Sequence, residues 1–142
     1  MTLITLIAAI NNDTSTISKK TGVNFPKHLS DEVCEYLIIQ SGYFDFKGRD
    51  GLLKKLKHYL PDEHFLILIY KDSKYRASIE RMCALRNYAA HSSLKAKKDA
   101  LKAINKKRIR TAGAWLKLGN NFKKILDDLL ELSNEVKMKA KF

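Results

Sequence analysis

The chain is short of cysteine and of long hydrophobic runs, and each scarcity excludes a class of protein. Its two cysteines, Cys34 and Cys83, are too few for a disulfide framework and belong to no CxxC or Cys/His cluster with metal-ligand spacing. Beyond the apolar residues 1–10, which lack the preceding Lys or Arg of a signal peptide, the longest apolar run is Phe65 to Tyr70, far too short to cross a bilayer. We therefore expect a soluble, cytoplasmic protein that binds no metal or other cofactor and no membrane.

Three common motifs are also missing. The chain has no GxxxxGK followed by Ser or Thr, no GxGxxG after a strand and no HExxH. Their absence removes the commonest phosphate-loop, dinucleotide-binding and zinc-hydrolase interpretations.

Acidic residues are scarce beside basic ones. The sequence has 27 Lys and Arg against 15 Asp and Glu, which gives a formal net charge of +12 at pH 7. A charge of this size favours a polyanionic partner, although a Lys-rich, solvated surface would give the same composition.

Helical periodicity dominates the rest of the sequence. One apolar stripe is expected to be buried on a helix from about residue 120 to 139: Phe122, Ile125, Leu126, Leu129, Leu130 and Leu132. Capping and periodicity predict further helices at about 30–42, 50–60, 74–92 and 94–107, with a short helical turn around Trp115, which we expect to anchor the core. We therefore expect a single all-α domain over residues 1–142, a bundle of about five to six helices.

Two segments are less regular. Phe65 to Tyr70 has strand propensity, but the sequence offers no second strand for it to pair with, and residues 61–63 (PDE) resemble a helix start. We expect a helix there. Residues 11–28 are polar, contain Gly22 and Pro26 and show little periodicity, so we expect a long loop.

The residues best suited to chemistry lie in the stretch ALRNYAAHSS, residues 84–93. On a helix, Asn87 and His91 are four residues apart and share a face, with Arg86 on the adjacent flank. The apolar stripe of the preceding turns continues onto Arg86, so we expect this charge at a core-facing position, where it should be paired or line a cleft. The small pair at 89–90 would let a second subunit approach closely. An ordinary helix end would also place a cation and an Asn here.

Residues 85–91, LRNYAAH, resemble the signature of the HEPN superfamily (higher eukaryotes and prokaryotes nucleotide-binding domains): an Arg, a polar residue directly after it, and a His after four to six intervening residues. The flanking helices extend the resemblance over nearly the whole chain. Many members are metal-independent endoribonucleases of toxin–antitoxin, abortive-infection and CRISPR-linked systems, and they dimerise so that two motifs face each other. Ser93 stands where members paired with nucleotidyltransferase antitoxins usually carry Tyr, which argues against that subfamily.

The resemblance implies a catalytic site of Arg86, Asn87 and His91, and their chemistry suits RNA cleavage by the RNA's own 2′-hydroxyl. That reaction needs a proton removed from the 2′-oxygen, a proton given to the departing 5′-oxygen, and negative charge stabilised on the phosphate. His91 can transfer protons near neutral pH, and Arg86 can hold two phosphate oxygens. Asn87 can hold His91 or a phosphate by hydrogen bonds. A single site has one His, so the acid and the base could come from two facing subunits.

Basic residues continue beyond the motif. Four lysines fall at successive helical steps and could track an RNA backbone, or form a solvated face: Lys95, Lys98, Lys102 and Lys106. The opposite, buried side of this helix is expected to carry three apolar residues: Leu94, Leu101 and Ile104. The remaining histidines have no comparable partners and receive no role: His28, His58 and His64.

The sequence thus predicts a homodimeric, metal-independent endoribonuclease that acts on RNA as a toxin or in anti-phage defence. An antitoxin or a larger defence protein would be a further partner. One alternative is a HEPN-like module that has lost catalysis and binds RNA or a nucleotide. Another is a helical dimerisation domain without a nucleic-acid ligand.

Overall fold

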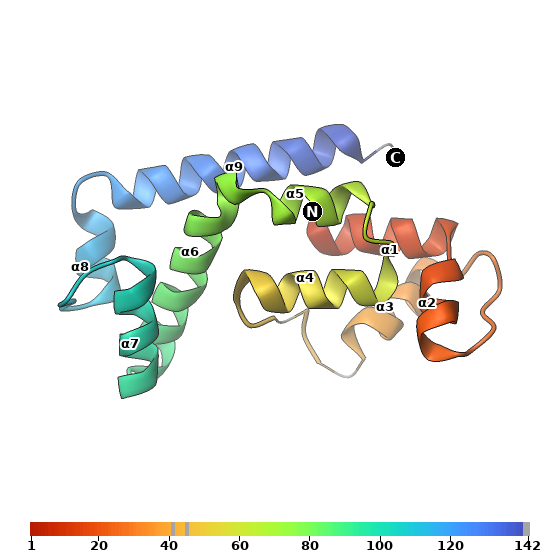
Figure 1. Cartoon of the computed structure of the whole chain (residues 1–142), viewed down its shortest axis with the longest axis horizontal. Coiled ribbons are helices and arrows are strands. Elements are labelled where there is room, and N and C mark those ends of the chain that lie inside the picture. Colours follow the sequence, from red (N-terminus) through yellow and green to blue (C-terminus); the bar gives the residue numbers. More distant parts are fainter. Residues whose placement is uncertain (41, 45, 141–142) are drawn as a thin grey trace. The chain divides into compact units, whose positions relative to one another are not determined.

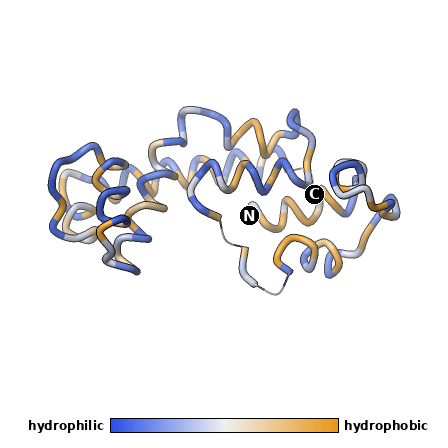
Figure 2. Tube along the Cα trace, turned by 60° about the horizontal axis from the view of Figure 1, so that its bottom comes forward, coloured by the Kyte–Doolittle hydropathy of each residue, from blue (hydrophilic) through white to orange (hydrophobic). Residues whose placement is uncertain are grey.

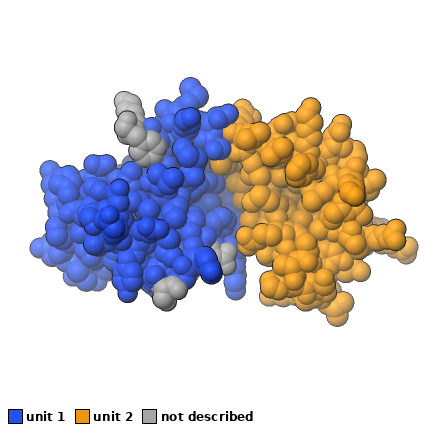
Figure 3. Space-filling view, turned by 180° about the vertical axis from the view of Figure 1, so that it is seen from behind, with its two compact units in different colours: residues 1–71, 133–142 blue, residues 72–132 orange. Residues whose placement is uncertain are grey.

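The computed structural model describes residues 1–40, 42–44 and 46–140. Within these ranges the chain forms nine helices and no strand (Figure 1), which confirms the predicted all-α class. Two compact units are present, residues 1–71 with 133–142 and residues 72–132 (Figure 3). The expectation of a single domain stays a prediction. No described helix is long and apolar enough to cross a membrane.

The first unit holds five whole helices and the end of the last one. The five are α1 (Thr2–Asn12), α2 (Ser15–Thr21), α3 (Asp31–Ile39), α4 (Gly48–Tyr59) and α5 (Phe65–Lys71). Apolar side chains from these helices form its core, among them Leu6, Ile10, Ile17, Cys34, Ile38, Leu52, Leu56 and Leu66. The Tyr59 hydroxyl donates a hydrogen bond to the Leu37 carbonyl at 2.7 Å, which joins α4 to α3.

Residues 11–28 do not form the long loop that the sequence predicts. α1 continues to Asn12, and α2 follows after two residues. α2 buries only Ile17, so it carries no apolar periodicity from which a helix could be inferred. Its ends define it instead: the Asp13 carboxylate accepts the Ser15 N–H at 2.9 Å, and Gly22 ends the helix at φ 71°. The hydrogen bond from Ser15 keeps the pKa of Asp13 below its usual range.

The helices predicted at 30–42 and 50–60 are found as α3 and α4, with ends shifted by one to three residues. The Ser30 hydroxyl caps α3 by accepting the Val33 N–H at 3.4 Å. The apolar run from Phe65 is helical, as predicted, and forms α5. The N–H of Leu66 donates to Nδ1 of His64 at 3.2 Å, so a histidine caps this short helix.

The second unit contains α6 (Ser73–His91), α7 (Leu94–Ala103), α8 (Ala112–Lys117) and the larger part of α9 (Asn121–Lys139). α6 and α7 form a helical hairpin joined through Ser92 and Ser93 (Figure 1). Six buried residues form one hydrophobic cluster, which we call the core of this unit: Leu85, Ala100, Ile104, Ile109, Ala112 and Ile125. Trp115 packs against this core, as expected, and lies on α8, the short helix predicted around it.

The described part of the chain has nine helices rather than the expected five to six, because α1 and α2 were not predicted and because α8 counts as a full helix. Apolar and polar residues alternate along the helices (Figure 2), as the periodicity indicates.

Two details of the second unit differ from the prediction. On α9, Ile125 and Leu132 are buried, whereas Phe122 and Leu130 are 57% and 54% exposed. Only part of the predicted apolar stripe is therefore buried. α7 ends at Ala103 rather than at 107, because Asn105 adopts φ 51° and the next N–H bonds back to a carbonyl of the last turn.

Candidate ribonuclease site

The motif occupies the last two turns of α6, where the chain reverses into α7. His91 is the final residue of α6, and Ser92 follows in the left-handed conformation at φ 44°, with its N–H donating to the Tyr88 carbonyl at 3.0 Å. Ser93 then caps α7 by accepting the Ala96 N–H at 3.1 Å. The motif therefore lies beside a tight turn between two helices, and the second of these helices begins at the Ser93 cap.

Arg86 is exposed, and the expectation that it faces the core is wrong. Over the last turns of α6, Leu85 is buried and Tyr88, three residues later, packs against the core of this unit. Arg86 is displaced by about 100° around the helix from Leu85, which turns it away from the core. Ala89 and Ala90 are exposed on the same end of α6. This part of the helix thus offers an open flank with a permanent positive charge and little side-chain bulk.

Asn87 is half-buried and His91 is exposed. Among residues 1–40, 42–44 and 46–140, neither side chain has a hydrogen-bond or ion-pair partner. The imidazole of His91 is therefore accessible to a bound molecule. The structure brings Arg86, Asn87 and His91 together in the sense that all three lie on the last two turns of one helix.

The predicted lysines divide between a helix and a loop. Lys95, Lys98 and Lys102 are exposed and fall on one face of α7, as predicted. Lys106 is also exposed but lies beyond the end of α7, so it does not extend the helical face. On the side expected to be buried, Ile104 is buried and Leu101 packs against the core, but Leu94 is 81% exposed.

α7 runs back along α6, so its lysines lead away from the motif. Arg81 of α6 shows this pairing directly, because its Nε donates to the carbonyl of Ala103, the last residue of α7, at 3.2 Å. After α7 the chain enters a loop that carries four exposed cations: Lys106, Lys107, Arg108 and Arg110. We call these four residues the basic loop.

Positive charge is concentrated in the second unit. Residues 72–132 contain fifteen Lys and Arg against six Asp and Glu, so they hold +9 of the total charge of +12. Between residues 81 and 124, thirteen basic residues accompany a single acidic one, Asp99. Such a field attracts polyanions to the part of the chain that carries the motif.

One connection at this site was not predictable from the sequence. The Tyr88 hydroxyl donates to the Arg110 carbonyl at 3.4 Å, which ties the basic loop to the motif helix. Nothing in the spacing of Tyr88 and Arg110, twenty-two residues apart, indicates this contact.

Comparison with protein-family models, with curated proteins and with solved structures found no match to this chain.

Proposed function

We propose that this protein is a HEPN-type endoribonuclease that cleaves RNA without a metal ion, by attack of the RNA's own 2′-oxygen. One observation carries the proposal: Arg86 and His91 are both exposed at the end of α6, where the strongly basic α7 begins. A phosphate backbone attracted to the first turn of α7 would lie near a cation and a titratable imidazole, both on the last two turns of α6.

The chemistry of the proposed reaction balances within the RNA and the protein. The 2′-oxygen forms a bond to phosphorus while the bond from phosphorus to the 5′-oxygen breaks, leaving a 2′,3′-cyclic phosphate and a 5′-hydroxyl. One proton leaves the 2′-hydroxyl and one proton is delivered to the 5′-oxygen, and imidazole groups carry both transfers. Arg86 stabilises the charge that develops on the phosphate oxygens, and Asn87 orients the phosphate or the imidazole of His91.

The two proton transfers are the reason to propose a homodimer. Each chain contributes one motif histidine, so a base and an acid require either one imidazole acting in turn or two imidazoles from facing chains. On the open flank beside Arg86, the exposed Ala89 and Ala90 have small side chains, which would let a second copy approach closely. A two-fold pairing across this flank would bring both motifs to one cleft.

The alternative is a module that binds RNA without cutting it. The exposed lysines of α7 and the basic loop would serve binding alone, and no side chain of the described chain holds the imidazole of His91 in a fixed orientation. A single assay distinguishes the two functions. Purified protein is incubated with total RNA, with His91→Ala and Arg86→Ala as controls. Cleavage that both substitutions abolish supports the nuclease, and binding without cleavage supports the module.

The biological setting that we propose is that of a toxin or an anti-phage effector, restrained by an antitoxin or a larger defence protein. This rests on the resemblance of residues 85–91 to the HEPN signature. Expression in bacteria tests it: the wild-type protein should arrest growth, and His91→Ala should not.

A further inference from the structure

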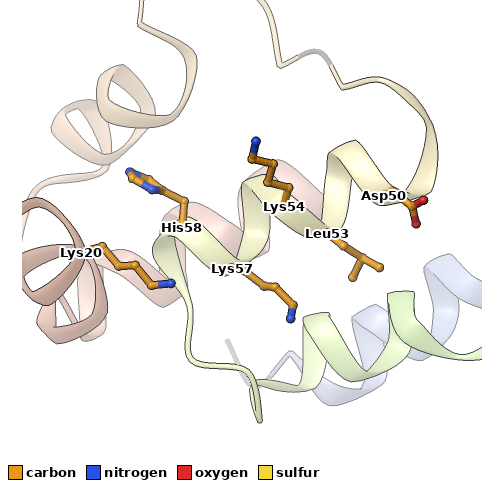
Figure 4. Close-up of a pocket in the computed structure, with 6 residues that line it drawn as sticks. All are labelled: Lys20, Asp50, Leu53, Lys54, Lys57 and His58. Atoms are coloured by element: carbon orange, nitrogen blue, oxygen red, sulfur yellow. The ribbon is translucent and has the colours of Figure 1, made fainter.

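The first unit contains a hollow that the proposed function does not use. It has a volume of about 500 Å³ and is lined by Lys20 from α2 and by Asp50, Leu53, Lys54, Lys57 and His58 from α4 (Figure 4). α2 and α4 pack against each other, so the hollow is built by two helices that are distant in the sequence. Its volume lies within the usual range for small-molecule sites.

The lining of this hollow is mostly basic, with Leu53 as its apolar residue. Lys54 and His58 are four residues apart on α4 and so share one face of that helix. Lys20 extends from α2 toward α4 (Figure 4). Leu53 is buried and supplies the apolar part of the lining. Three ammonium groups and one imidazole from two helices therefore border one space.

The nearby carboxylates leave two of these lysines available. Asp62 is paired with Lys57 at 3.0 Å, and this bond is the main reason why the pKa of Asp62 lies below its usual range. The charge of Lys20 contributes to the lowered pKa of Asp62 through space, after the larger effect of Lys57. Asp50 is highly exposed and lies 3.7 Å from Arg49. Within the described part of the chain, Lys20 and Lys54 form no ion pair.

We propose that this hollow binds a phosphate group, held by Lys20, Lys54 and His58. Two unpaired ammonium groups and an imidazole suit an anion with several acceptor oxygens. The space exceeds what a phosphate alone fills, so it has room for the organic part of a phosphate ester. The ester could be a small phosphorylated molecule or the backbone of an RNA. The hollow lies in the unit that lacks Arg86 and His91, so the inference does not depend on RNA cleavage.

The test follows the ring resonances of the histidines by NMR in the 142-residue chain while inorganic phosphate replaces chloride at constant ionic strength. The His58 resonances should shift and saturate, whereas His28, exposed in the same unit, serves as the internal control. Lys20→Gln and Lys54→Gln should each weaken binding by about threefold, as expected for an exposed charge contact. Lys19→Gln is the matched control, since it removes the same charge from the same helix outside the hollow.

Two results would overturn the proposal. One is an equal and non-saturating shift of His58 and His28. The other is an equal loss of affinity in Lys19→Gln and Lys20→Gln, which would mean diffuse attraction.

A second titration uses a single-stranded RNA and the His91→Ala protein, so that no cleavage occurs. If RNA shifts His58 and phosphate competes with it, the site takes an RNA backbone. If phosphate alone shifts His58, the site takes a small phosphate ester.

Discussion

The hydroxyl of Tyr88 donates a hydrogen bond to the backbone carbonyl of Arg110 at 3.4 Å. Tyr88 lies within the motif, directly after Asn87, and its ring packs against the core of the second unit. Arg110 closes the basic loop. The Tyr88 side chain therefore connects α6 to the basic loop, to which we assign a part in RNA binding.

Removing this one hydroxyl should loosen the basic loop. Tyr88→Phe keeps the ring in the core and loses a hydrogen bond worth about 1 kcal/mol at most, so the unit should stay folded. We expect faster amide hydrogen exchange in residues 106–110 and RNA binding weakened by a few-fold. Tyr36→Phe, an exposed change in the first unit, is the control. Unchanged exchange and unchanged binding in Tyr88→Phe would show that the bond positions nothing.

Three lysines on one face of α7 should set the salt dependence of RNA binding. Neutralising Lys95, Lys98 or Lys102 should reduce the slope of log affinity against log salt by about 0.7 per contact with single-stranded RNA. Lys97→Gln removes an exposed charge from another side of the same helix and should change the slope less. Equal slopes for all four variants would mean that the face is only solvated.

The proposed dimer should depend on the open flank of α6. Light scattering at micromolar concentration should give twice the chain mass of 16.3 kDa. Ala90→Glu places bulk and charge on that flank and should yield monomer, whereas Ala77→Glu, an exposed change earlier on α6, should leave the dimer intact. A wild-type protein that is only monomeric would contradict the two-fold site.

Stability should fall in mildly acidic solution because of His64. Its Nδ1 accepts the Leu66 N–H, which requires an unprotonated nitrogen, and burial lowers the pKa of His64. The imidazole of an unfolded histidine has a pKa of about 6.5. Near and below that pH the unfolded state therefore binds more protons than the folded state. The free energy of unfolding should therefore decrease as the pH falls through about 6.5 toward the lower, folded pKa.

His64→Asn tests this assignment, since Asn can cap a helix without titrating. Urea unfolding at about pH 7.5 and about pH 5.5 should show a smaller loss of stability in the variant than in the wild type. An equal loss in both proteins would assign the pH dependence to other groups.

Capping and strong periodicity made α3, α4, α6 and most of α9 predictable, because those signals act over neighbouring residues. α2 was not predictable because its ends, rather than an apolar face, define it. The exposure of Arg86 was missed because the apolar stripe of the earlier turns was extended by spacing alone, whereas the α6 side chains that pack on the core near its end are Leu85 and Tyr88. The end of α7 depends on Asn105 adopting a left-handed conformation, which its neighbours do not specify.

The candidate residues themselves came from the sequence, but their surroundings did not. LRNYAAH indicated Arg86, Asn87 and His91, and helical spacing placed Lys95, Lys98 and Lys102 on one face. The bond from Tyr88 and the hollow between α2 and α4 join segments distant along the chain, so only the folded structure brings them together.

The chemistry of the RNA ends that the purified protein produces in EDTA tests the proposed mechanism of cleavage. We expect cleavage without metal that leaves a 2′,3′-cyclic phosphate and a 5′-hydroxyl, and no cleavage where the cut position carries 2′-deoxy or 2′-O-methyl. His91→Ala should abolish turnover and keep the helical circular dichroism, because His91 is exposed at the end of α6. Arg86→Ala should be severely impaired, and Arg86→Lys should keep part of the activity. Cutting by His91→Ala at the wild-type rate would contradict the proposed mechanism, and so would products with 5′-phosphates that form only with added magnesium.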